Sequence, residues 1–151
     1  MPLAFTMFQH LLIATDGSAD GERALRQGLG LAKALSAKVT VATVTEPWTE
    51  AVYATLPTPS LIQIYEKSAA GNAAVILDGA KKAADQVGVQ CLTRHIKDQH
   101  APQGIIKAAK DEQCDLIIVG SHGRGALGRA LLGSVSSQVL TLSDRAVLVC
   151  R

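Results

Sequence analysis

The chain has 151 residues and a mass of 15.8 kDa, so we expect residues 1–151 to form one domain, with no room for a second. A hydrophobic fraction of 48% and a positive mean hydropathy exclude a disordered chain, and an aromatic fraction of 3% favours an aliphatic core of α/β type. The net charge of +2 is too small to indicate a nucleic-acid or membrane-surface protein.

Apolar runs of strand length alternate along the chain with segments that have helical spacing. Ser18 is a natural N-cap for the first helix, because Asp20 and Glu22 fall in its first turn and leucines recur on one face up to Leu35. In chain order the expected elements are a strand over Leu11–Thr15, the helix after Ser18, a strand over Val39–Val44, a helix over Leu61–Val87, a strand over Val89–Ile96, a helix over Pro102–Glu112, a strand over Leu116–Val119, a helix over Ser134–Leu142 and a strand over Ala146–Cys150.

This alternation predicts one parallel sheet with helices on both faces, because parallel neighbours need crossover connections. The first, fourth and fifth strands are almost unbroken apolar runs, which is typical of strands buried on both faces. Gln90, Arg94 and His95 interrupt the third strand, so we place that strand at an edge of the sheet.

The segment from Thr45 to Ser60 breaks the pattern, because it contains three of the five prolines together with Trp48 and Tyr53. We interpret it as a long loop at the carboxyl end of the second strand. Loops longer than about 12 residues are often functional, and open α/β sheets bind ligands at this end of their strands. The alternative is a surface connection in which Trp48 packs for stability.

Five of the thirteen glycines lie between Gly120 and Gly133, directly after the fourth strand. Gly120 and Gly123 would let the main chain turn and approach a ligand, while Gly133 and Ser134 open a helix whose free N–H groups suit a phosphate. The chemistry therefore predicts a phosphate-binding loop, with a surface loop capped by glycine as the alternative. The segment has no Gly-Lys-Ser/Thr, and its chance match to Gly-x-Gly-x-x-Gly follows the wrong strand for a dinucleotide site.

The spacing Gly120-x2-Gly123-x9-Gly133-Ser134 closely resembles the nucleotide-binding signature of the universal stress protein family. The sequences of the first strand and of the final strand also resemble those of that family, so the resemblance covers essentially the whole chain. It implies membership of the nucleotide-binding subgroup. It also implies an open five-stranded parallel sheet of order 3-2-1-4-5 with helices on both faces, a Rossmann-like fold of the adenine nucleotide alpha hydrolase type.

The resemblance further implies a bound ATP, ADP or AMP across the carboxyl ends of the first and fourth strands, with Mg²⁺ balancing the phosphate charge. Asp16 would face the adenosine together with Ala14 and Thr15, Val44 would lie against the adenine, and Gly120 at the ribose. The metal ligands stay unassigned. The residues implied around the phosphates are Gly123, Gly133, Ser134, Val135 and Ser136, and the implied site also takes in Val119, His122 and Arg124.

Single residues of this site have competing interpretations. Asp16 ends a buried strand, where a lone carboxylate is costly, so we favour a ligand-binding role over helix capping. His122 either donates to a phosphate or is exposed in the loop, and we find no base or nucleophile partner that would make it catalytic. Arg124 is either a phosphate clamp or a solvated charge, and we interpret Arg129 as solvated. Cys150 is predicted to be a small core hydrophobe rather than a redox centre.

The cysteines and the N-terminal segment bear on the cellular compartment. Cys91, Cys114 and Cys150 are an odd number at wide spacing, which fits neither a disulfide framework nor a metal knuckle. The segment Met1–Gln9 has no signal-peptide features, and no apolar run approaches the roughly 20 residues that span a bilayer. We therefore expect a cytoplasmic protein with neither a membrane nor a nucleic-acid partner.

The final strand, Ala146–Cys150, is an apolar edge, and an uncovered edge invites pairing with a second copy. Members of the universal stress protein family usually form homodimers through this strand. The resemblance therefore implies a homodimer with a two-fold axis.

Several functions compete for this sequence. We favour a nucleotide-dependent regulatory dimer of the stress response with no more than weak catalysis. The alternative is a slow ATPase or an autophosphorylating protein that uses Ser134 or Ser136 as the acceptor. A response-regulator receiver would need an acidic pair after the first strand, and an ATP pyrophosphatase would need Ser-Gly-Gly-x-Asp-Ser there. The segment Thr15–Ser18 supplies neither.

Overall fold

The computed structural model describes residues 8–48, 58–122 and 131–151. Strands and helices alternate through these residues, as the hydrophobic pattern predicts. The elements are β1 (His10–Ala14), α1 (Ala19–Leu35), β2 (Lys38–Thr45), α3 (Pro59–Val87), β3 (Cys91–Lys97), α4 (Ala101–Asp111), β4 (Leu116–Gly120), α5 (Ser134–Leu142) and β5 (Ala146–Cys150).

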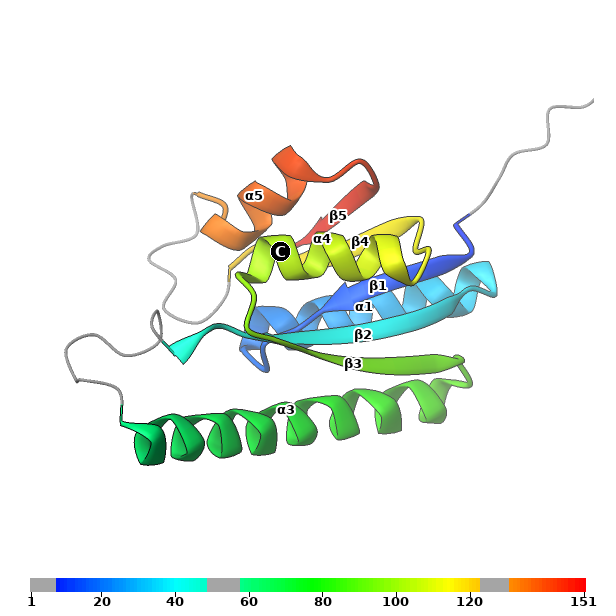
Figure 1. The fold of residues 1–151 in the computed structure, drawn as a ribbon. Helices are drawn as coiled ribbons and strands as arrows, with labels where there is room; N and C mark the ends of the chain where they lie inside the picture. The colour runs from blue at the N-terminus through cyan, green and yellow to red at the C-terminus, as the bar shows by residue number, and fades with distance from the viewer. Residues whose placement is uncertain (1–7, 49–57, 123–130) are drawn as a thin grey trace, which may run out of the picture.

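The five strands form one parallel sheet of order β3-β2-β1-β4-β5 (Figure 1). Leu11 of β1 is in register with Val39 of β2 on one side and with Leu116 of β4 on the other. The predicted strand order is confirmed, and so is the position of β3 at an edge. The order reverses between β1 and β4, so the chain leaves β1 in one direction and later returns to its other side.

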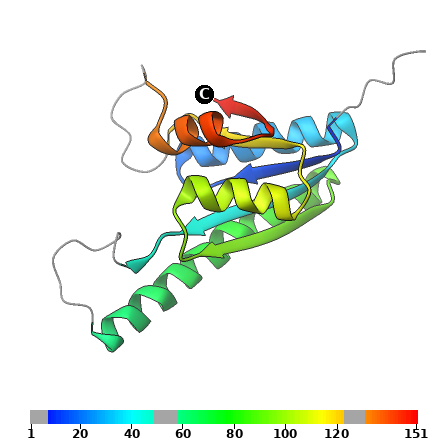
Figure 2. The same ribbon diagram turned by 45° about the horizontal axis from the view of Figure 1, so that its top comes forward.

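Of the helices that the structure describes, two lie on each face of the sheet, because right-handed crossovers change face where the strand order reverses. Helices α1 and α3 lie on one face and α4 and α5 on the other (Figures 1 and 2). Each face has its own aliphatic core. Leu11 and Ile13 of β1 point into the core beneath α1 and α3, whereas Leu12 points into the core beneath α4 and α5. A central strand buried on both faces therefore shows no polar alternation.

Cap residues set the helix boundaries, and two predicted boundaries need correction. The predicted loop from Thr45 to Ser60 is too long, because β2 continues through Thr45 and Thr58 caps α3 by accepting a hydrogen bond from Leu61 N at 3.3 Å. Its centre, residues 49–57, lies outside the described residues. The strand predicted from Val89 starts later, because Val89 N donates to Ala84 O at 3.0 Å and closes the end of α3.

The fifth strand differs from its expected burial. β1 and β4 are buried along almost their whole length, but exposed and half-buried residues alternate along β5 up to its end. Its pattern was interpreted as burial on both faces, and that is wrong because β5 is an edge strand. Leu148 keeps 38% of its surface exposed. Cys150 is buried, and burial raises the pKa of its thiol, as expected for a core residue.

Candidate functional site

The carboxyl ends of β1, β2 and β4 meet at the reversal of the strand order. In open α/β sheets such a point leaves a crevice that ligands use. Three segments surround it here: the turn between β1 and α1, the end of β2, and the start of α5 after β4. Most of the site residues implied by the sequence lie on these segments.

The turn after β1 holds Asp16 in a defined position. The Asp16 side chain accepts a hydrogen bond from Ser18 N at 2.9 Å, and the buried Thr15 hydroxyl accepts one from Gly17 N at 3.2 Å. Gly17 has a φ of +78°, a left-handed conformation that favours glycine. Ser18 rather than Asp16 caps α1. The half-buried carboxylate of Asp16 therefore stands at the mouth of the crevice.

A pocket of about 280 Å³ opens beside Asp16, between the end of β2 and α3. Asp16 and Val44, which the sequence implies at the adenosine, both line it. The wall mixes aliphatic side chains with hydroxyl, amide and carboxylate groups, as small-molecule pockets do. The lining residues are Asp16, Thr43, Val44, Thr45, Glu46, Tyr65, Ser68, Ala69, Asn72, Ala73 and Ile76.

The contribution of α3 to this pocket was missed by the sequence analysis. Tyr65, Ala69, Asn72 and Ile76 follow one another at helical spacing, so they share one face of α3. Periodicity identifies such a face but does not say which strand end lies opposite. The one available signal was the amide of Asn72 on a face that is otherwise aromatic, small or aliphatic.

Contacts of Tyr65 fix one wall of the pocket. Its hydroxyl donates to the carbonyl oxygen of Glu46 at 2.8 Å, and its ring packs edge to face against Trp48 with centroids 5.4 Å apart. Burial raises the pKa of Tyr65, and the carboxylates of Glu46 and Asp98 act in the same direction. The hydroxyl therefore keeps its proton and remains a donor. Trp48 and Tyr65 together tie the end of β2 to α3.

The start of α5 is bound to the end of β4. Gly133 N donates to the carbonyl oxygen of Ser121 at 2.7 Å, and Ser121 N donates to Cys150 O at 2.8 Å. The buried hydroxyl of Ser136 donates to Ser121 O at 2.9 Å and lies 3.2 Å from Gly133 O. Gly133 is the N-cap of α5, as predicted. The first turn of α5 is therefore held next to the crevice.

Two glycines of this region allow close main-chain packing. A Cβ on Gly120 would lie 2.8 Å from the carbonyl oxygen of Asp20, and a Cβ on Gly133 would lie 3.1 Å from that of Ser121. Gly120 thus permits contact between β4 and the first turn of α1, and Gly133 permits contact between α5 and the end of β4. This packing role comes in addition to the predicted approach of a ligand.

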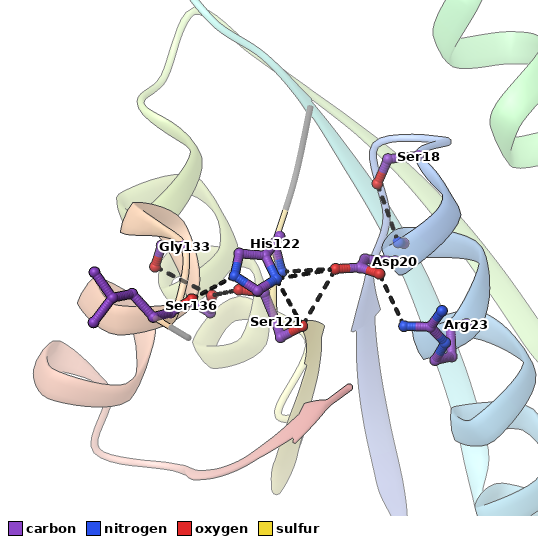
Figure 3. Close-up of polar contacts among 9 residues, drawn as sticks. Ser18, Asp20, Arg23, Ser121, His122, Gly133 and Ser136 are labelled. Carbon is purple, nitrogen blue, oxygen red and sulfur yellow. Dashed lines mark hydrogen bonds and ion pairs between the residues drawn. The ribbon is translucent and has the colours of Figure 1, made fainter. Parts of the chain in front are cut away.

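A polar cluster joins α1 to the end of β4 (Figure 3). The carboxylate of Asp20 accepts hydrogen bonds from the Ser121 hydroxyl at 3.2 Å and from His122 N at 3.1 Å, and pairs with Arg23 at 2.9 Å. Partial burial raises the pKa of Asp20, but the hydrogen bond from Ser121, the charge of Arg23 and the contact with His122 outweigh it and hold the pKa below its usual value. Asp20 is therefore a stable anion at neutral pH.

Asp20, Ser121 and His122 are the residue types of a hydrolytic triad, but their geometry is different. In a triad the serine and the carboxylate contact opposite nitrogens of the imidazole. Here Nδ1 of His122 lies 3.1 Å from Ser121 Oγ and 3.3 Å from Asp20 Oδ2, while Nε2 contacts the carbonyl oxygen of Leu131. Ser121 is also 4% exposed. The cluster therefore links three segments and does not present a nucleophile.

Comparison with known proteins decides the family. The model of the universal stress protein family matches residues 7–151. This chain belongs to the universal stress protein family. The universal stress protein YxiE of Bacillus subtilis is 33% identical over 152 aligned residues, which cover 96% of this chain and all of YxiE.

Solved structures agree with this assignment. The structure of the hypothetical protein MJ0577 has a TM-score of 0.82 and 27% identity, and the match covers 96% of each chain. A universal stress protein in complex with cAMP has a TM-score of 0.72 and 27% identity, over 97% of this chain and 99% of the other. The five-stranded sheet of this universal stress protein is therefore the fold of its family.

The fold brings the expected site residues that the structure describes to the carboxyl ends of the strands, and two of them, Asp16 and Val44, line the pocket. Gly123 and Arg124, like Arg129, lie outside the described residues. Ser134 is exposed, whereas the Ser136 hydroxyl is buried and donates within the protein. The expected residues that the structure places around the crevice are Ala14, Thr15, Asp16, Val44, Val119, Gly120, His122, Gly133, Ser134, Val135 and Ser136.

Residues 8–48, 58–122 and 131–151 contain neither a metal-binding cluster nor a membrane-spanning helix. No group of three histidine, cysteine, aspartate or glutamate side chains there is placed to hold a metal ion. None of the helices in that part of the chain is long and apolar enough to cross a membrane.

Proposed function

We propose that this universal stress protein binds an adenine nucleotide across the carboxyl ends of β1 and β4. The pocket beside Asp16 carries the proposal, because it lies next to the carboxyl end of β1, one of the two strands at the reversal, and includes both Asp16 and Val44. The adenine would lie against Val44 and the adenosine would face Asp16. A universal stress protein of 27% identity that was solved in complex with cAMP supports this class of ligand.

The phosphates would lie at the first turn of α5. Main-chain N–H groups at a helix start carry partial positive charge and suit anions. Gly133 brings no side chain into this turn, and the exposed Ser134 can add a hydroxyl donor. The buried Ser136 would support the turn through its bond to Ser121 O instead of touching the phosphate. With ATP, Mg²⁺ would be held chiefly by phosphate oxygens.

A substitution that fills the pocket tests this placement. Ala69→Phe adds a ring inside the pocket wall, so we expect it to remove detectable ATP binding in calorimetry. Val75→Phe is the matched control, because Val75 lies on the same helix with 74% of its surface exposed. The control should bind ATP like the parent protein. Equal affinity of both variants for ATP would place the nucleotide elsewhere.

We also propose a homodimer through Ala146–Cys150, which would make nucleotide binding a regulatory signal between two copies. Apolar side chains support this assembly: Leu148 on β5 is 38% exposed, and Leu140 and Leu142 on α5 are 49% and 57% exposed. β5 has a strand neighbour on one side within the described chain. A second β5 can pair with its other side.

An enzymatic form of the proposal, slow hydrolysis or autophosphorylation, makes a distinct prediction. Of the two serines considered as acceptors, Ser134 is exposed at the helix start, whereas Ser136 is 3% exposed and hydrogen-bonded. Any phosphate transfer would therefore modify Ser134. Incubation with radiolabelled ATP and Mg²⁺, followed by peptide mapping, detects it.

A further inference from the structure

The imidazole of His122 is surrounded by hydrogen-bond acceptors. Its Nε2 contacts the carbonyl oxygen of Leu131, which can only accept. Its Nδ1 lies 3.3 Å from the carboxylate of Asp20, which also only accepts, and 3.1 Å from the hydroxyl of Ser121. The side chain of His122 is 14% exposed, so little water can replace these partners.

Both ring nitrogens of His122 have partners inside the protein. Because the carbonyl oxygen of Leu131 can only accept, Nε2 is the donor in that contact. Nδ1 lies next to the Ser121 hydroxyl, which is also 3.2 Å from the Asp20 carboxylate. The imidazole therefore links Leu131 to Ser121 and Asp20.

The contacts of His122 connect the segments that flank the proposed phosphate site. Asp20 belongs to the first turn of α1, Ser121 follows β4, and Leu131 lies two residues before the N-cap Gly133 of α5. Figure 3 shows Asp20, Ser121 and His122 side by side, with Ser136 and Gly133 beyond them. Holding Leu131 and Ser121 together also holds Gly133, because Gly133 N donates to Ser121 O.

We propose that Asp20 and His122 form a hydrogen-bonded clasp that positions the first turn of α5 for the nucleotide phosphates. The proposal rests on the proposed function, and it makes His122 a positioning residue instead of a phosphate ligand. With both ring nitrogens engaged inside the protein, His122 acts through Leu131 and Ser121.

The carboxylate of Asp20 holds the clasp from α1. It contacts the imidazole with one oxygen and pairs with Arg23 through the other. Partial burial raises the pKa of Asp20, but the hydrogen bond from Ser121 and the charge of Arg23 hold that pKa below its usual value, so Asp20 remains an acceptor. Removing either Asp20 or His122 should therefore release the start of α5 and weaken ATP binding.

Calorimetry of ATP and of adenosine tests the clasp. His122→Ala removes both ring contacts, and Asp20→Ala removes the carboxylate that accepts from Ser121 and from His122 N. Each should weaken ATP binding by on the order of tenfold. Adenosine has no phosphate, so its affinity should not change. Asp85→Asn, which removes an exposed carboxylate paired with Lys81 on α3, is the control and should behave like the parent protein.

The contact of His122 with Leu131 can be followed without nucleotide by long-range ¹H–¹⁵N spectra of the imidazole. Nε2 of the parent protein should carry a proton, because it donates to the carbonyl oxygen of Leu131. Unaltered ATP affinity in His122→Ala would overturn the clasp and leave the nucleotide site intact. An equal loss of adenosine binding would also overturn it, because the variant would then have a general structural defect. If the parent protein binds neither ligand, the proposed function fails and the clasp fails with it.

Discussion

Gly120 packs directly against the main chain of Asp20: a Cβ on Gly120 would lie 2.8 Å from the carbonyl oxygen of Asp20 and 2.9 Å from its carbonyl carbon. This contact brings the end of β4 against the first turn of α1. It also explains how the Asp20 carboxylate reaches Ser121 and His122, although about one hundred residues separate them in the chain. One glycine therefore determines the geometry of the polar cluster.

Gly120→Ala tests this packing. The added methyl group would collide with main-chain atoms that have no freedom to rotate away, so we expect the free energy of unfolding to fall by about 1–3 kcal/mol in urea denaturation. Gly30→Ala is the control, because Gly30 lies in α1 and a Cβ there meets nothing within 4 Å. That variant should gain about 0.5–1 kcal/mol. Similar responses from both glycines would contradict the close contact.

The pH dependence of stability should depend in part on His10. This side chain is 5% exposed, and its Nε2 lies 2.8 Å from Thr40 Oγ1. Burial lowers the pKa of His10, and Lys38 lowers it further against the opposing effect of nearby carboxylates. The unfolded chain, with the ordinary histidine pKa of 6.5, then binds the proton more readily than the folded chain. Stability from neutral His10 is present above that pH and is lost as pH falls through the lower pKa of the folded state.

Urea midpoints at about pH 7.5 and about pH 5 measure this loss. His10→Gln cannot titrate, so its midpoint should fall less between the two pH values than that of the parent protein. Some loss should remain, because burial and Lys97 also lower the pKa of His95. An unchanged loss in His10→Gln would show that His10 makes no contribution.

The two serines at the start of α5 should separate binding from stability. Ser134→Ala removes an exposed hydroxyl, so we expect its stability to be unchanged. ATP binding should weaken about tenfold, which is the contribution of one hydrogen bond to a charged group. Ser136→Ala removes one of the two hydrogen bonds to the carbonyl oxygen of Ser121 and should lower the free energy of unfolding by about 0.5–1.5 kcal/mol. Calorimetry and urea denaturation of both variants check this division. The reverse pattern would place the phosphate nearer Ser136.

The dimer can be tested with charges placed on the two edges of the sheet. Leu148→Arg puts a charge on the exposed face of β5, and we expect monomers in sedimentation velocity. Leu92→Arg is the matched control, because Leu92 is 40% exposed on β3 at the opposite edge. The control should remain dimeric. A parent protein that is monomeric at all concentrations would contradict the proposed homodimer.

Local patterns predicted most of the fold. The bounds of α5 and β5 match those predicted, because Ser143 and Asp144 separate two apolar segments clearly. β3 was placed at an edge from its polar residues. The prediction that β5 is buried on both faces was wrong. An apolar run looks the same at an edge as in the centre of a sheet, and the strand order distinguishes the two positions.

The site was less predictable than the fold, because its contacts join distant segments. The resemblance supplied Asp16 and Val44, which do line one pocket, but the α3 wall with Tyr65 and Asn72 has no local signal that names its neighbour. The partnership of His122 with Asp20 was missed for the same reason. Residue spacing describes one element at a time, whereas this site depends on where elements meet.

Calorimetric titration with ATP and Mg²⁺ tests most directly whether an adenine nucleotide binds at the carboxyl ends of β1 and β4. The purified protein is first denatured, any released nucleotide is identified by chromatography, and the emptied protein is refolded. We predict saturable heat with about one ATP per chain, and no such heat for Ala69→Phe, whose ring fills the pocket. The absence of both released nucleotide and binding heat in a folded parent protein would contradict nucleotide binding at this site.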